Sequence, residues 1–153
     1  MPRTTDPVGK RTHRQLAGYL FNRAWSLLEQ KARTPEEDEE LIHTAHASRY
    51  HWGRVGGPLQ LSVGEWQLSR VYAVLGRPEP ATFHGRRAAK IAREAHLPPF
   101  YLAYGFEARA RASALAGRRR DRGRFLKDAA RVGATVRDPE ERRMLLDDLA
   151  TIR

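Results

Sequence analysis

The sequence is divided by prolines and glycines into stretches of helical length, and this division restricts the folds open to the chain. Within a stretch, apolar residues recur every three or four positions, as Leu20, Ala24 and Leu27 do, which is the spacing of one face of an α-helix. No stretch bounded by turn residues shows the period-two alternation of a half-buried strand. The sequence therefore predicts an all-α protein.

Local signals predict where the helices begin and end. Thr34, followed by Pro35 and Glu37, has the form of a capping box with proline at the first helical position, and Asp138 with Pro139 forms a similar start. Glycine or proline marks the other breaks, near residues 56–58, 76–80, 97–99 and 117. We expect about seven helices, over residues 13–33, 35–53, 59–75, 79–95, 100–116, 119–136 and 139–152.

Length and composition limit the domain organisation. A chain of 153 residues suits one hydrophobic core, so we expect a single domain over residues 13–153. Residues 1–12 show no periodicity and are predicted to form a flexible arm. The absence of cysteine excludes disulfides, thiolate metal sites and thiol nucleophiles. No apolar run is long enough to cross a bilayer, so we expect a cytoplasmic protein without a membrane partner.

The third and fourth predicted helices resemble the core of a tetratricopeptide repeat. The matching residues are Leu68, Ser69, Tyr72, Gly76, Ala81 and Ala88. In that family, small residues allow close helix contact, an aromatic residue fills the groove within a helix pair, and a glycine ends the first helix. A second, partial match has Ala110, Ser113, Gly117 and Ala129 at the same offsets. The two glycines lie 41 residues apart, and Arg122 stands where the repeat pattern has alanine.

This resemblance covers residues 61–152 and implies a stack of antiparallel αα-hairpins whose concave surface binds a partner. The whole chain is similar to bacterial tetratricopeptide-like proteins. The order of the helices predicts the same packing independently, because helices joined by short turns must lie side by side in opposite directions. A compact helical bundle is the alternative fold.

Positive charge is concentrated in the second half of the chain. The formal net charge is +10, of which residues 1–76 carry +2 and residues 77–153 carry +8. Seven arginines form a candidate patch for an anionic partner: Arg86, Arg87, Arg118, Arg119, Arg120, Arg122 and Arg124. Such clustering favours an acidic protein or a nucleic acid. A solvated helical surface and an arginine-rich codon bias are the alternative explanations.

Histidine and carboxylate residues gather in the second predicted helix. At about 100° per residue, Glu39, His43, His46 and Tyr50 share the face opposite the core. Glu39, His43 and His46 are spaced to converge on one divalent metal ion, the single cofactor that the sequence suggests. Glu40 and His43 also have the Glu-x-x-His spacing of di-iron bundles, but those bundles use the motif twice and this chain has one copy. We therefore expect no cofactor, and polar side chains that hydrogen-bond without metal are the alternative explanation of the cluster.

A ligand groove is a second interpretation of the same region. His46 and Tyr50 would combine with Trp66, Arg70 and His84 of the following helices to hold a small anionic or aromatic ligand. Trp66 also has the position of a core residue, which is the competing explanation for it.

The leading functional hypothesis is a non-enzymatic module that holds a peptide or an acidic protein in the groove of the helical stack. No nucleophile elbow and no glycine-rich phosphate loop accompany the serines, which leaves an enzymatic role without support. One alternative is a small-molecule or metal-binding protein, catalytic or not, built around Glu39, His43, His46 and Tyr50. A further alternative is electrostatic binding of nucleic acid through residues 86–124, which the lack of a recognition motif or aromatic platform disfavours.

Overall fold

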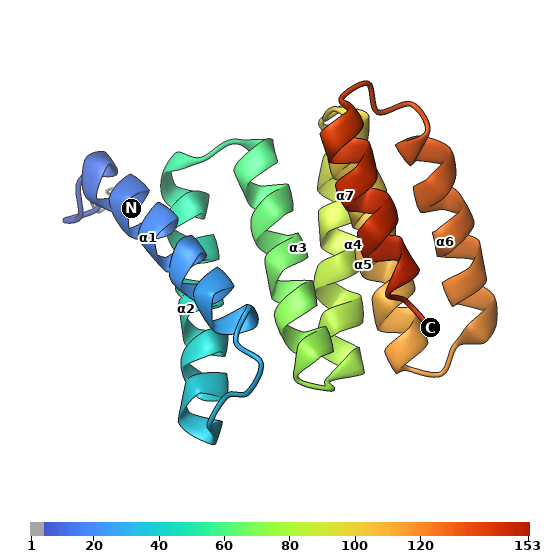
Figure 1. Ribbon diagram of the computed structural model, residues 1–153. Helices are drawn as coiled ribbons and strands as arrows, with labels where there is room; N and C mark the ends of the chain where they lie inside the picture. The colour runs from blue at the N-terminus through green and yellow to red at the C-terminus, as the bar shows by residue number, and fades with distance from the viewer. Residues whose placement is uncertain (1–4) are drawn as a thin grey trace.

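The computed structural model describes residues 5–153, and within them the chain forms seven α-helices and no strand (Figure 1). The helices are α1 (Lys10–Leu28), α2 (Pro35–Val55), α3 (Pro58–Val74), α4 (Pro78–Glu94), α5 (Pro99–Leu115), α6 (Arg119–Gly133) and α7 (Pro139–Ala150). The predicted all-α class and the predicted number of helices are confirmed for this part of the chain. The largest differences lie at the two ends of α1 and at the end of α6.

The two predicted helix starts carry the expected caps. Thr34 Oγ1 accepts a hydrogen bond from the backbone N–H of Glu37, and the Glu37 carboxylate accepts one from the N–H of Thr34. Asp138 Oδ1 accepts from the backbone N–H groups of Glu140 and Glu141. Each cap satisfies donors that the first turn of a helix leaves without a partner. This is why short sequence patterns located α2 and α7 correctly.

The beginning of the chain differs from the predicted arm over residues 1–12. Residues 1–4 of that arm lie outside the described residues, and Lys10 already belongs to α1. Asp6 Oδ2 accepts hydrogen bonds from His13 Nε2 at 2.9 Å and from Arg54 Nε at 2.9 Å. Residues 5–9 are therefore attached to both α1 and α2. The apolar pattern begins only at residue 13, so it gave no signal for the first turn of α1.

The helices pack in consecutive antiparallel pairs, α1 with α2, α3 with α4 and α5 with α6. Contacts of α2 with α3 and of α4 with α5 join the pairs into a stack, and α7 packs last, against α5 and α6. Figure 1 shows this order as a progression from the N-terminal pair to the C-terminal helices. The joint between α4 and α5 is close because Gly105 faces Ala89: a Cβ at Gly105 would lie 2.6 Å from the Ala89 Cα.

Three helices end in the same left-handed turn. Gly76 after α3 and Gly117 after α5 both have φ of +71°, a conformation that glycine adopts without steric cost. His96 after α4 has φ of +51°, and the next N–H, that of Leu97, donates to the Ala92 carbonyl as it would after a glycine. A non-glycine residue in this conformation costs roughly 1 kcal/mol.

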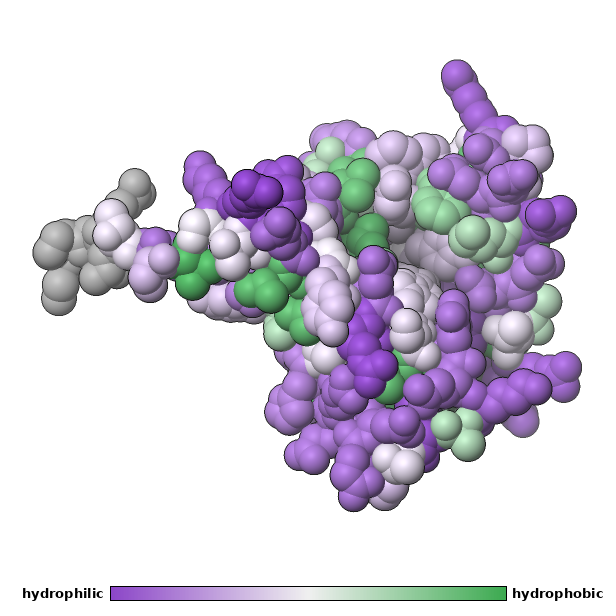
Figure 2. Space-filling model, turned by 60° about the vertical axis from the view of Figure 1, so that its left-hand side comes forward, coloured by the Kyte–Doolittle hydropathy of each residue, from purple (hydrophilic) through white to green (hydrophobic). Residues whose placement is uncertain are grey.

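The surface drawn in Figure 2 is mostly hydrophilic. Hydrophobic residues on this side gather near the N-terminal helix and in a hollow near the middle of the molecule. Among the described residues, no helix combines the length and hydropathy needed to cross a membrane.

Tyr72 packs between α2, α3 and α4, as the repeat resemblance implies for this position. Its side chain is buried, its hydroxyl lies 2.8 Å from His46 Nε2, and its ring stacks on the ring of His84. Tyr72→Ala should therefore lower the free energy of unfolding by about 3–5 kcal/mol. Tyr72→Phe, which removes only the hydroxyl, should cost about 0.5–1.5 kcal/mol.

Urea unfolding of both variants measures these losses. A loss of less than about 0.5 kcal/mol for Tyr72→Ala, the range of an ordinary surface change, would show that the ring does not fill the space between the helices.

Candidate functional site

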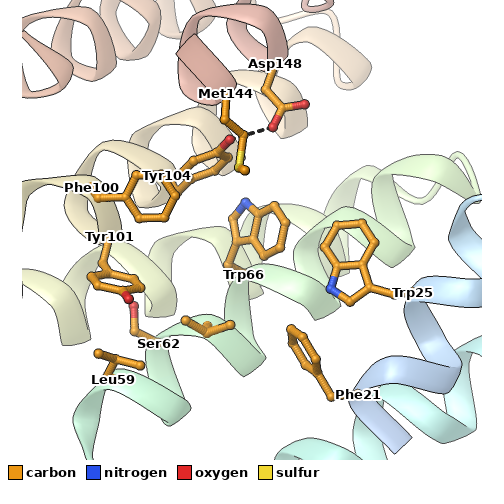
Figure 3. Close-up of a pocket in the computed structure, with 11 residues that line it drawn as sticks. Phe21, Trp25, Leu59, Ser62, Trp66, Phe100, Tyr101, Tyr104, Met144 and Asp148 are labelled. Atoms are coloured by element: carbon orange, nitrogen blue, oxygen red, sulfur yellow. Dashed lines mark hydrogen bonds between the residues drawn. The ribbon is translucent and has the colours of Figure 1, made fainter. Parts of the chain in front are cut away.

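A hollow of about 440 Å³ opens between α1, α3, α5 and α7 (Figure 3). We call it the aromatic hollow, and it is lined by Phe21, Trp25, Leu59, Ser62, Val63, Trp66, Phe100, Tyr101, Tyr104, Met144 and Asp148. The ring of Trp66 lies 5.4 Å from the rings of both Trp25 and Tyr104, measured between centroids. Binding pockets of this size and apolar lining hold small ligands or single bulky side chains.

A buried carboxylate fixes the central ring of this hollow. The Glu107 side chain is fully buried, and its Oε2 accepts a hydrogen bond of 3.0 Å from Trp66 Nε1. Its Oε1 accepts from Arg70 at 3.2 Å and from Arg111 at 2.7 Å. Two guanidinium groups and an indole N–H thus compensate a charge that would be costly to bury alone. Trp66 is consequently held in one orientation at the base of the hollow.

The same network attaches α7. The Tyr104 hydroxyl donates to Asp148 Oδ2 at 2.6 Å, and Arg111 donates to the backbone carbonyl of Asp148 at 3.1 Å. Burial first, and then the hydrogen bond to Asp148, raises the pKa of Tyr104 far above its ordinary value. The hydroxyl therefore remains a donor, and α7 stays in place as one wall of the aromatic hollow.

A second hollow continues along the same faces of α3 and α5. It measures about 360 Å³ and is lined by Arg70, Ala73, Val74, Arg111, Ala114, Leu115, Thr151, Ile152 and Arg153. We call it the C-terminal hollow. Arg70 and Arg111 lie between it and the Glu107 carboxylate, so the two hollows are adjacent sites along one groove.

The five residues predicted to line one ligand groove lie in three places. Trp66 and Arg70 contact Glu107 in the groove. His46 and His84 lie together near Tyr72, on the opposite side of α3. Tyr50 is 61% exposed and lies against His13 and His51. The prediction placed all five residues on one side of α3. In the structure, one side of α3 packs against α5 and another packs against α2 and α4.

A second buried carboxylate joins α2, α3 and α4. Glu65 accepts hydrogen bonds from Arg49 Nε at 2.9 Å and His84 Nδ1 at 2.7 Å, and Arg87 Nε lies 3.1 Å away. Burial alone would raise the pKa of Glu65, but His84, Arg49 and Arg87 together lower it below its ordinary value. Arg87, which the sequence placed in the candidate basic patch, therefore has a structural partner.

His46 lies beside this cluster. Its Nε2 is 2.8 Å from the Tyr72 hydroxyl, and its ring lies edge-on to His84 at 5.6 Å. Burial, followed by the nearby charge of His84, lowers the pKa of His46 below its ordinary value. His46 is an exposed residue whose ring lies at the edge of this cluster, within hydrogen-bond distance of Tyr72.

The predicted metal ligands do not come together. Glu39 and His43 are about three-quarters exposed, at 75% and 76%, with 4.0 Å between Oε1 and Nε2, while His46 is directed to Tyr72. Among residues 5–153, no group of three histidine or carboxylate side chains is placed to hold a metal ion.

The candidate basic patch is also divided. Arg86, Arg118 and Arg124 line a small recess between α4, α5 and α6, together with Arg109, which the sequence analysis did not select. Arg119, Arg120 and Arg122 do not line this recess.

Sequence reasoning also missed the aromatic residues of α1 and α5 and the carboxylate of Glu107. One signal was present, because Glu107 is the only acidic residue between Pro98 and Gly117. A single carboxylate in a largely apolar helix, with Arg111 four residues later, is the pattern of a buried ion pair. The positions of Trp25 and Tyr104 gave no comparable signal.

No protein-family model, no curated protein and no solved structure matches the chain. Within residues 5–153 the fold is an all-helical stack of sequential pairs. Its function is inferred from the hollows and charges of the molecule itself.

The Glu65 cluster predicts a loss of stability in acid. Since the pKa of Glu65 is lower in the folded protein than its ordinary value of 4.5, its contribution is complete above that value and is lost as the pH falls through the folded pKa. Glu65→Gln leaves Arg49 and Arg87 without their carboxylate and should cost about 3 kcal/mol near neutral pH. The difference from the wild type should shrink in more acidic solution.

Urea unfolding at a series of pH values tests this. Glu94→Gln is the control, since Glu94 is an exposed partner of Lys90 and should contribute about 0–1 kcal/mol at every pH. Equal stability of Glu65→Gln and wild type near neutral pH would rule out the compensated buried charge.

Proposed function

We propose that the protein is a non-enzymatic interaction module of the tetratricopeptide-like type, which binds a peptide segment of a partner protein in the groove between α1, α3, α5 and α7. The observation that carries this proposal is the aromatic hollow, a site of about 440 Å³ formed by helices from all three pairs and by α7.

The pattern of small residues supports the repeat assignment. Gly76 and Gly117 end α3 and α5 with the same φ of +71°, as the resemblance requires of a helix-ending glycine. The small residues of the motif are buried: Ser69, Ala81, Ala88, Ala110, Ser113 and Ala129. The first helix of each pair lines the groove. These features support a repeat whose inner helices present the binding surface.

The chemistry of the hollow favours a bulky apolar side chain. The Glu107 charge is compensated by Arg70 and Arg111, so the base of the hollow does not require a charged ligand. Rings with one polar edge, such as those of Trp25 and Trp66, contribute large contact areas at little entropic cost. Peptide complexes commonly bury one or two such anchor residues, which supply most of the binding energy. We therefore expect a leucine, methionine, phenylalanine or tryptophan in the aromatic hollow.

Positive charge favours carboxylates beside that anchor. In the neighbouring C-terminal hollow, Arg70 and Arg111 are paired with Glu107, and Arg153 adds a further positive charge next to the apolar side chains of Val74 and Leu115. The net charge of +10 also attracts acidic partners over long range and increases the rate of encounter. The favoured partner is thus an acidic peptide segment with a bulky apolar anchor.

Selection from a random peptide library tests this proposal. Enriched peptides should contain a bulky apolar residue near acidic residues, and Met144→Glu at the rim should weaken their binding by about tenfold or more, because it places a charge against the apolar anchor. Leu146→Glu is the matched control, since Leu146 lies on the same helix and is 53% exposed against 55% for Met144, but does not line the hollow. Fluorescence anisotropy of labelled peptides measures both affinities.

Two outcomes would contradict the proposal. One is a library from which no peptide is enriched, and the other is a set of peptides that bind Met144→Glu and wild type equally well. Circular dichroism of both variants checks that the helices remain intact.

A further inference from the structure

A small recess lies between α4, α5 and α6, away from the residues that line the aromatic hollow. It has a volume of about 130 Å³ and is lined by Thr82, Arg86, Arg109, Ser113, Arg118, Asp121, Arg124 and Phe125. Four of these eight residues are arginines, and one is acidic. We call it the arginine recess. It also lies at the N-terminal end of α6, where the helix dipole adds positive potential.

Three of the four guanidinium groups of the arginine recess have a partner within the recess. The Cζ of Arg109 lies 4.1 Å from the centroid of the Phe125 ring, and that of Arg124 lies 4.7 Å from it. Arg118 donates a hydrogen bond of 3.0 Å to the Thr82 hydroxyl. Stacking and hydrogen bonding of this kind reduce the entropy that a ligand must remove when it binds.

The charge of the recess is incompletely compensated. Asp121 lies 3.5 Å from Arg124, and neither Arg86 nor Arg109 has a carboxylate within ion-pair distance among residues 5–153. Burial, together with the charges of Arg86, Arg124 and Arg93, lowers the pKa of Arg109 below its ordinary value. Like charges held this close repel one another, and a bound anion would relieve that repulsion.

A larger hollow adjoins the recess. It measures about 440 Å³, is lined by Phe83, Arg86, Arg87, Ala89, Lys90, Arg93 and Arg109, and shares Arg86 and Arg109 with the recess. We call it the Phe83 hollow, because the Phe83 ring is 57% exposed and offers the largest apolar surface there. An anion bound at Arg86 and Arg109 would therefore have room beside it for an attached organic group.

We propose that the arginine recess binds the phosphoryl group of a small phosphomonoester, whose organic part lies in the Phe83 hollow. The recess has room for about four water molecules at roughly 30 Å³ each, which suits a group of few atoms. Arginines approaching from three helices match the several oxygens of a phosphoryl group, because each guanidinium can donate two hydrogen bonds to it. This site is independent of the peptide groove.

The form of the site favours a phosphomonoester over nucleic acid. A polyanion gains affinity from every phosphate that it places along a basic row. The consecutive residues Arg119 and Arg120 are exposed but lie outside both hollows, so the built part of the surface is a single recess. One phosphoryl group can contact the arginines of that recess without further basic residues outside it.

Calorimetric titration with inorganic phosphate and with phenyl phosphate, at constant ionic strength, tests the proposal. Both should bind, and phenyl phosphate should bind about tenfold more tightly because its ring occupies the Phe83 hollow. Arg109→Gln and Arg86→Gln should each weaken binding of phenyl phosphate about tenfold or more. Arg120→Gln removes the same charge outside the recess and should change the affinity by no more than about twofold.

Three results would overturn the proposal. The first is the absence of phosphate binding above that of chloride, and the second is an equal loss of affinity in Arg120→Gln and Arg109→Gln. The third is a single-stranded oligonucleotide that binds more tightly than phenyl phosphate and loses affinity equally in all three variants, which would assign the surface to nucleic acid instead. Circular dichroism and thermal unfolding of the variants separate loss of the site from loss of the fold.

Discussion

The arrangement of the C-terminal half depends on the buried charge of Glu107. A carboxylate with no exposed surface is tolerated only where cations and hydrogen-bond donors replace the water that it loses. Arg70 and Trp66 reach it from α3, and Arg111 reaches it from its own helix. Because Arg111 also donates to the Asp148 carbonyl, one compensated charge fixes α3, α5 and α7 relative to one another.

This network explains how a helix with little buried surface forms one wall of the aromatic hollow. Leu145 is the one fully buried side chain of α7, and the remaining attachment is polar, through Asp148 and Thr151. Polar attachment leaves Met144 at the rim of the aromatic hollow. On α5, residues two positions apart face different sites, since Arg111 faces the groove with Tyr104 while Arg109 and Ser113 line the arginine recess. One central helix thus lines both the groove and the arginine recess.

Local patterns predicted the helices well, because caps and apolar spacing act within a few residues of sequence. They predicted the site poorly. A helical wheel gives directions around one axis, but it does not say which neighbour each direction meets, so Trp66 and His84 were combined although they lie on different sides of α3. The prediction that Arg118, Arg119 and Arg120 share one patch has the same weakness. Adjacent helical residues point about 100° apart, and of these three only Arg118 lines the recess. His96 has the positive φ that usually requires glycine, and its residue type gave no sign of this in the sequence.

Amide hydrogen exchange of Glu107→Gln tests the role of the buried charge most directly. Glutamine keeps the shape of the side chain and can still accept a hydrogen bond from Trp66, but it no longer compensates Arg70 and Arg111. The account predicts that amides of α7 lose protection by about tenfold or more, while those of α2, which has no residue hydrogen-bonded to Glu107, Arg70 or Arg111, keep theirs. Unchanged protection of α7 in the variant would contradict the claim that this charge holds the groove together.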